Sequence, residues 1–118
     1  EIKNPILESL YNKECLLPEA CNWHIIELLA EGSVNGGLTY DSLREKLVEN
    51  LKKYNRVKPK FAFSFGPEIS LKDVLEGFVE DDTVKERNPI LKYVVTDRGK
   101  ERLENKIELI RKFIPNLQ

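Results

Sequence analysis

The sequence has few of the residues on which most enzymes and metal proteins depend. It contains one histidine, His24, two cysteines, and no glycine-rich phosphate loop of the GxxxxGK[ST] or GxGxxG type. A catalytic centre needs several titratable groups that converge on one point, and no nucleophile motif surrounds the histidine. We therefore expect neither catalysis nor a cofactor.

Two cysteines are too few for a disulfide framework and are typical of a reducing compartment. With His24, Cys15 and Cys21 form the pattern C-x5-C-x2-H, which offers three ligands where a structural zinc site has four. We expect no bound metal. The longest apolar runs have a few residues, far below the roughly 20 that cross a bilayer. The expectation is a cytoplasmic or nucleoid-associated protein without membrane contact.

Charge of one sign is not in excess either. The chain has 19 Lys and Arg against 20 Asp and Glu, a net charge of −1. No global field therefore draws it to nucleic acid, and any such affinity has to come from a local patch. With 118 residues, 41% hydrophobic and 33% charged, the composition favours a single compact domain over 1–118.

Apolar periodicity, prolines and capping residues predict a mostly helical chain. Helices are expected over 5–14, 18–32, 40–54, 71–80 and 97–114. Thr39 and Thr96 are the expected N-caps of the third and fifth helices, and Gly32 is expected to stop the second. Gly77, inside the fourth helix, makes that helix less stable by roughly 1 kcal/mol than alanine would. Either a close approach of neighbouring atoms requires the glycine, or the fold simply tolerates it.

Two segments have β-like patterns. Phe61, Phe63 and Phe65 alternate along a short stretch, which predicts a half-buried strand. From Val84 onward the sequence predicts a hairpin with a polar tip over 85–88, Pro89, and a return strand over 90–95. The predicted fold class is α+β with a helical majority.

The sharpest local charge asymmetry lies between Asn50 and Pro67, a run without a carboxylate. Such a patch could neutralise several phosphates of a nucleic acid. The alternative is a solvated turn whose lysines favour the negative end of the preceding helix. The cations of this run are Lys52, Lys53, Arg56, Lys58 and Lys60.

The last predicted helix has an apolar stripe with alternating intervals of four and three residues, the spacing of a and d positions in a coiled coil. This a/d stripe predicts either a homodimer through the C-terminal helix or packing of that helix on the chain's own core. The spacing leaves both interpretations open. Its residues are Leu103, Ile107, Ile110, Ile114 and Leu117.

The order helix, helix, helix, β-hairpin, helix resembles the winged helix-turn-helix DNA-binding fold. The segment YVVTDRGKERL at 93–103 resembles the Y-x-L-T-x-x-G-x-x-x-L exit from the wing in PadR-like and MarR-like transcriptional regulators. The segments 24–29, 38–47 and 70–79 look like the three core helices of that fold, the last being the recognition helix.

The resemblance implies a dimeric regulator that binds duplex DNA. The helix that begins at Ser70, with Lys72, would approach the major groove. Lys85, Arg87 and Lys92 would be the wing contacts to the backbone or minor groove. The helix from 97 would pair with its copy in a two-fold dimer.

The segment 71–82 also motivates a competing hypothesis. It carries five carboxylates and one cation, a poor surface for phosphates. A winged-helix module for protein–protein assembly would instead turn this acidic helix toward a protein partner. The acidic residues are Asp73, Glu76, Glu80, Asp81 and Asp82.

Overall fold

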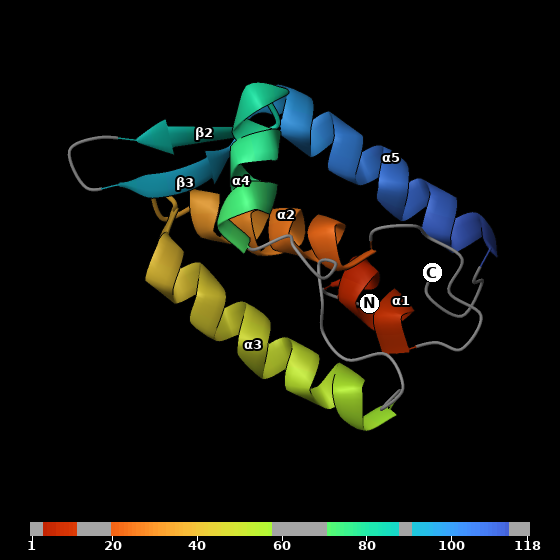
Figure 1. Cartoon of the computed structure of the whole chain (residues 1–118). Coiled ribbons are helices and arrows are strands. Elements are labelled where there is room, and N and C mark those ends of the chain that lie inside the picture. Colours follow the sequence, from red (N-terminus) through yellow and green to blue (C-terminus); the bar gives the residue numbers. More distant parts are fainter. Residues whose placement is uncertain (1–3, 12–19, 58–70, 88–90, 114–118) are drawn as a thin grey trace.

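The computed structural model describes residues 4–11, 20–57, 71–87 and 91–113. Within these ranges the chain is mostly helical with a small antiparallel sheet, which confirms the α+β class (Figure 1). No helix in these ranges is long and apolar enough to cross a membrane. The elements are α1 (Pro5–Tyr11), α2 (Ala20–Ser33), β1 (Leu38–Thr39), α3 (Tyr40–Val57), α4 (Leu71–Glu80), β2 (Val84–Arg87), β3 (Lys92–Val95) and α5 (Asp97–Phe113).

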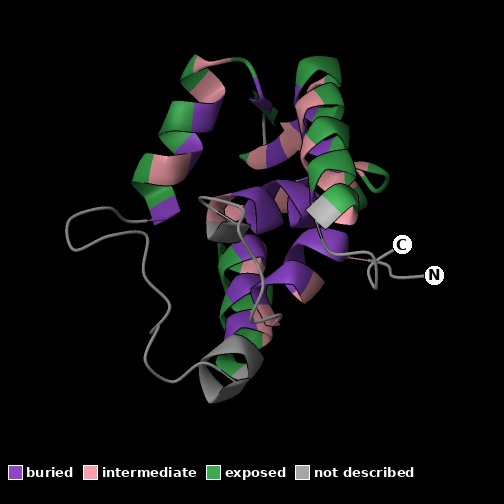
Figure 2. Ribbon diagram, turned by 90° about the vertical axis from the view of Figure 1, so that its right-hand side faces the viewer, coloured by how far each residue is buried: buried purple, intermediate pink, exposed green. Residues whose placement is uncertain are grey.

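Helix α2 lies at the centre of the fold and contacts α1, α3, α5 and the sheet. Its residues Ile25, Ile26 and Leu29 are fully buried. In Figure 2, α1 and α2 are mostly purple, whereas α5 has an exposed green face. A helix that is apolar around most of its circumference can be stable only when other elements surround it, and this sequence supplies them.

The sheet has the order β1-β3-β2 with antiparallel neighbours. In the β2–β3 hairpin the paired positions run from Val84 with Val95 to Arg87 with Lys92. Two expectations are corrected here. Residues 85–87 belong to β2 and not to the hairpin tip, and β1 was not expected at all. Leu38 and Thr39 pair with β3, a tertiary contact that two residues cannot reveal on their own.

The end of α2 also differs from the expectation. Gly32 lies inside the helix and is buried against Leu38, whose side chain would be 2.5 Å from an added Cβ. The helix is stopped by Gly36, which has a φ of 91°. Gly36 N–H donates to Ser33 O and Gly37 N–H donates to Gly32 O, the two bonds of a Schellman motif.

Helix α4 spans 71–80 as predicted and ends in the same motif without a glycine. Asp82 has a φ of 64°, and its N–H donates to Val79 O at 3.2 Å. Thr83 N–H donates to Phe78 O at 2.9 Å. An aspartate therefore occupies the left-handed position that glycine adopts at lower cost.

Replacing Asp82 by glycine is expected to stabilise the protein by about 0.5–1 kcal/mol, because relief of left-handed strain outweighs the larger entropy of the unfolded chain. The measurement is the midpoint of urea unfolding. A lower midpoint for Asp82→Gly would contradict this account of the helix end.

Among the other helix boundaries, the described starts of α1, α3 and α5 agree with the sequence, whereas the end of α3 does not. Thr39 caps α3, since its Oγ1 accepts the Ser42 N–H at 3.2 Å, and α3 continues to Val57, three residues beyond the expected end. Helix α1 begins at Pro5 as expected. Several expected features lie outside the described residues. They are the strand at 61–65, Ser70, and the helix ends expected at 12–14, 18–19 and 114.

Gly77 is exposed on α4, and an added Cβ would have no neighbour within 4 Å. Of the two explanations that the sequence left open for this glycine, the structure supports simple tolerance. It is thus a position where alanine fits without any displacement.

Trp23 joins three helices. It is 4% exposed, packs edge to face on Phe78 of α4, and lies under two cations of α5, Arg102 at 5.3 Å and Lys106 at 5.4 Å from the ring centroid. Arg102 also donates to Asp81 Oδ2 at 2.9 Å. Burial raises the pKa of the Asp81 carboxyl, but hydrogen bonds from Thr83 and Arg102 outweigh it, and the net shift is downward.

Candidate nucleic-acid interface

The register of the hairpin separates its side chains onto two faces. Residues that pair across antiparallel strands point to the same side of the sheet. Val84 and Val95, which are paired, are 1% and 6% exposed, so their side belongs to the core. Glu86 and Tyr93 form the other pair on that side.

The opposite side of the hairpin is basic. Lys85 pairs with Val94, and Arg87 pairs with Lys92, so three cations share one face without a carboxylate among the paired positions. Lys85 and Arg87 are exposed, and Lys92 is half-buried. We call Lys85, Arg87 and Lys92 the basic hairpin face. These are the three residues expected as wing contacts, and the register brings them together.

An open depression adjoins this face, between the hairpin and the first turns of α5, with a volume of about 670 Å³. We call it the hairpin–α5 depression. Val94 contributes an apolar side chain, Val95 borders the depression although its side chain faces the core, and the charged lining has four cations and two carboxylates. The charged residues are Lys85, Arg87, Arg98, Lys100, Asp82 and Asp97.

Thr96 fixes the start of α5 against the hairpin. Its N–H donates to Thr83 O at 3.1 Å, and its hydroxyl donates toward the Asp82 carbonyl. Its Oγ1 also accepts the Gly99 N–H at 3.0 Å, which confirms Thr96 as the N-cap. The threonine thus joins the end of α4, the return strand and the last helix.

Gly99 permits this close approach. An added Cβ would be 2.1 Å from Thr83 O and 2.8 Å from Val95 Cγ1, which leaves no room for any side chain. The T-x-x-G part of the exit segment therefore has a physical explanation in this chain. Thr96 caps the helix, and Gly99 lets its first turn pack on the backbone that leads into β2.

Of the other cations in the sequence prediction, the two whose side chains are described, Lys52 and Lys72, do not line this depression. Lys52 is exposed in the C-terminal half of α3, a helix that runs from the sheet toward the end of the molecule far from the hairpin (Figure 1). Lys72 is exposed on α4. The side chains of Lys53 and Arg56 are not described, and Lys58, Lys60 and Ser70 lie outside the described residues.

The face of α4 near the core side of the hairpin is negatively charged. Asp73, Glu76 and Glu80 are exposed, whereas Asp81 is half-buried and pairs with Arg102. Burial raises the pKa of the Tyr93 phenol, and the carboxylates of Glu86 and Glu76 raise it further. Among the paired positions of the hairpin, the cations thus lie on one side and the carboxylate of Glu86 lies on the other.

The described part of the a/d stripe faces the chain's own core. Leu103 and Ile110 are 7% and 3% exposed, and Ile107 packs partly buried against the same cluster. These side chains stabilise the monomer, which is one of the two interpretations that the spacing left open. Ile114 and Leu117 lie outside the described residues.

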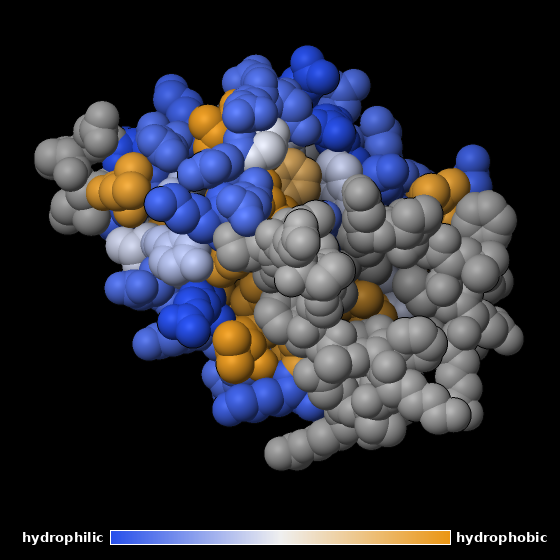
Figure 3. All heavy atoms as spheres, in the orientation of Figure 1, coloured by the Kyte–Doolittle hydropathy of each residue, from blue (hydrophilic) through white to orange (hydrophobic). Residues whose placement is uncertain are grey.

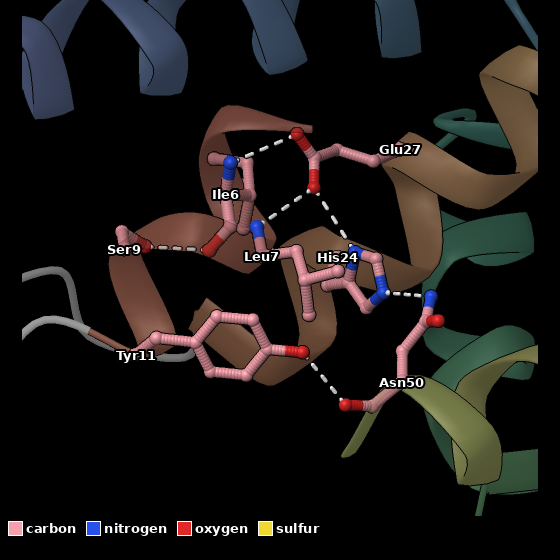
Figure 4. A network of polar contacts seen from close by, with 7 residues as sticks. All are labelled: Ile6, Leu7, Ser9, Tyr11, His24, Glu27 and Asn50. Carbon is pink, nitrogen blue, oxygen red and sulfur yellow. Dashed lines mark hydrogen bonds and ion pairs between the residues drawn. The ribbon is translucent and has the colours of Figure 1, made fainter. Parts of the chain in front are cut away.

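The single histidine belongs to a buried polar network (Figure 4). His24 Nδ1 lies 3.0 Å from Glu27 Oε1, and its Nε2 lies 3.0 Å from Asn50 Nδ2. A neutral ring with its proton on Nδ1 satisfies both contacts. Both nitrogens therefore have structural partners, and neither is open to a metal ion. The described residues contain no group of three potential metal ligands.

Glu27 extends this network to α1. Its Oε2 accepts the Ile6 N–H at 2.8 Å and its Oε1 accepts the Leu7 N–H at 3.0 Å, so a carboxylate of α2 caps the first turn of α1. Tyr11 at the end of α1 donates to Asn50 O at 2.8 Å. The network holds α1, α2 and α3 together.

Sequence reasoning missed Arg98 and Lys100 as site residues. They lie in the first turn of α5, where the sequence suggested only a helix start after the hairpin. The signal was present, since two cations flank the glycine that must pack closest to the hairpin. Its significance depends on the close approach of α5 to Thr83 and Val95, a tertiary feature.

The described surface in the orientation of Figure 3 is predominantly hydrophilic, with small separate hydrophobic areas. In the described ranges the exposed large apolar side chains are also scattered along the chain, and they are Val34, Val48, Leu91 and Leu109. Single exposed apolar residues are normal on a protein surface. Among the described residues, the charged hairpin is therefore a more distinctive surface feature than any apolar patch.

Comparison with known protein families finds none that matches this chain. No characterised protein and no solved structure matches it either. The function is therefore inferred from the geometry and charge of the chain's own residues.

Proposed function

We propose that this protein is a winged helix-turn-helix domain that binds duplex DNA as a transcriptional regulator, with the β2–β3 hairpin as its wing. The order α2, α3, α4, hairpin, α5 supports the proposal because it is the order on which the resemblance rests. The observation that carries it is the basic hairpin face, where Lys85, Arg87 and Lys92 share one side. The proposal does not require a dimer.

Cations on an exposed face suit a phosphate backbone better than a base edge. Each phosphate that a protein neutralises releases a counterion and steepens the dependence of log K on log salt by about 0.9. Three aligned cations thus contribute up to about three units of slope. The slope of log K against log salt therefore measures how many phosphates the protein contacts.

The test uses a labelled random-sequence duplex and fluorescence anisotropy at several salt concentrations. Wild type is expected to bind in the micromolar range with a steep slope. The variant Lys85→Gln/Arg87→Gln/Lys92→Gln is expected to flatten that slope by about two to three units, because it removes three phosphate contacts.

A charge-matched control removes three exposed cations from other surfaces, in Arg44→Gln/Lys46→Gln/Lys112→Gln. It lowers the net charge equally but leaves the hairpin intact, so its slope is expected to stay near that of wild type. Equal slopes for wild type and the hairpin variant would exclude the hairpin from the interface.

One observation favours a second function, that of a protein–protein assembly module. The exposed carboxylates of α4, with Lys72 as the cation on the same helix, suit a basic protein partner. Under this alternative, wild type shows no duplex binding even at low salt. Charge reversal in Glu76→Lys/Glu80→Lys would then abolish partner capture, whereas Asp81 should be left unchanged because it pairs with Arg102.

A further inference from the structure

We infer that the hairpin–α5 depression holds one sugar–phosphate strand of the duplex, with Arg98 and Lys100 forming a second cationic bank opposite Lys85 and Arg87. The inference rests on the proposed function, since it specifies where the backbone of the same ligand lies. It adds two residues from a different element to the interface.

The positions of the four cations support a groove more than a flat patch. Lys85 and Arg87 project from β2, whereas Arg98 and Lys100 project from the first turn of α5, and all four line one depression. A strand of regularly spaced phosphates can contact both sides at once. Long, flexible cationic side chains suit such a ligand because they can follow its charges.

The uncharged polar side chains of the depression already have partners within the protein. Ser33 Oγ donates to Leu29 O and accepts the Val95 N–H. The N–H groups of Gly99 and Lys100 donate to Oγ1 and O of Thr96. What remains is side-chain charge beside apolar Val94, which fits contacts to the phosphate backbone.

A carboxylate of the lining gives a test in which binding should become tighter instead of weaker. Asp97, in the first turn of α5, opposes a phosphate held between the banks. The variant Asp97→Asn should therefore tighten duplex binding by about two- to fivefold at low salt, since a like charge is removed at close range. A damaged fold cannot produce such a gain, so unchanged or weaker binding by a folded Asp97→Asn would overturn the inference.

The complementary test removes the second bank. The variant Arg98→Gln/Lys100→Gln should flatten the salt slope of random-duplex binding by about one to two units relative to wild type. The control Lys46→Gln/Lys112→Gln removes two cations outside the depression and should leave the slope unchanged. Circular dichroism confirms that each variant is folded.

The outcomes separate this inference from the proposed function. If the basic hairpin face proves necessary while Arg98→Gln/Lys100→Gln binds with the slope of wild type, the second bank is excluded and the proposed function stands. If wild type does not bind the duplex at low salt, both fail. Flattening by each variant, with tighter binding by Asp97→Asn, establishes the groove.

Discussion

Replacing Gly99 by alanine is expected to destabilise the protein by about 3 kcal/mol, near the upper end of the cost of overpacking. The new Cβ would be 2.1 Å from Thr83 O, a backbone atom that cannot rotate away as a side chain can. Thr83 O also accepts the Thr96 N–H at 3.1 Å, so moving it disturbs the bond that aligns α5 with the hairpin.

The matched control is Gly77→Ala, the same substitution in the exposed middle of α4. No atom lies within 4 Å of the new methyl group, and alanine has the better helix propensity. We expect Gly77→Ala to stabilise the protein by about 0.5–1 kcal/mol. Urea unfolding followed by the fluorescence of the only tryptophan measures both variants. A Gly99→Ala midpoint equal to that of wild type would contradict the close approach.

Gly99→Ala also has a consequence for binding. Because the substitution displaces the first turn of α5 from β2, the two banks of the hairpin–α5 depression move relative to each other. At a temperature where the variant is still folded, duplex affinity should fall although no charge has been removed.

Replacing Glu27 by alanine is the second change with a large expected effect, about 3 kcal/mol or more. The carboxylate accepts the N–H groups of Ile6 and Leu7 and contacts His24 Nδ1, all in buried surroundings. Its removal leaves two buried backbone donors without an acceptor, at about 1–3 kcal/mol each. The chain would lose the cap of α1 and the contact that orients His24.

Two further variants test this interpretation by the same urea measurement. Glu27→Gln keeps one acceptor oxygen but turns an amide donor toward another donor, so an intermediate loss is expected. Glu104→Ala removes an exposed carboxylate of α5 and should change stability by less than about 0.5 kcal/mol. A loss for Glu27→Ala no larger than that of Glu104→Ala would exclude the network as a stabilising element.

Local signals were sufficient for much of this fold. Thr39 and Thr96 were expected as N-caps, and each accepts the backbone N–H three residues later. Helix 71–80 was expected from its apolar stripe and is observed over the same residues. Such features depend on neighbours in sequence, so a sequence pattern contains them.

Features that depend on tertiary pairing were missed or misplaced. The strand at Leu38–Thr39 exists because β3 lies beside it, and residues 85–87 extend β2 because their partners on β3 are in register. Glycine commonly ends a helix, but Gly32 lies inside α2 and leaves room for the side chain of Leu38. Sequence position alone could not distinguish these uses.

The candidate site shows the same division. Lys85, Arg87 and Lys92 were named from the sequence, but their common face follows only from the register of the hairpin. Arg98 and Lys100 lie beside them because Gly99, which has no side chain, allows the first turn of α5 to pack closely on the hairpin. The sequence predicts no catalytic role for His24, but Asn50 could be identified as its partner only after α3 had been placed beside α2.

The hairpin concentrates positive charge locally on a protein that is nearly neutral as a whole. The net charge of −1 implies no long-range attraction to a polyanion, yet Lys85, Arg87 and Lys92 share one side of the hairpin. Under the proposed function, this local charge would turn the cations of β2 and α5 toward an approaching duplex. Electrostatics would then act on the association rate through orientation during encounter and not through overall attraction.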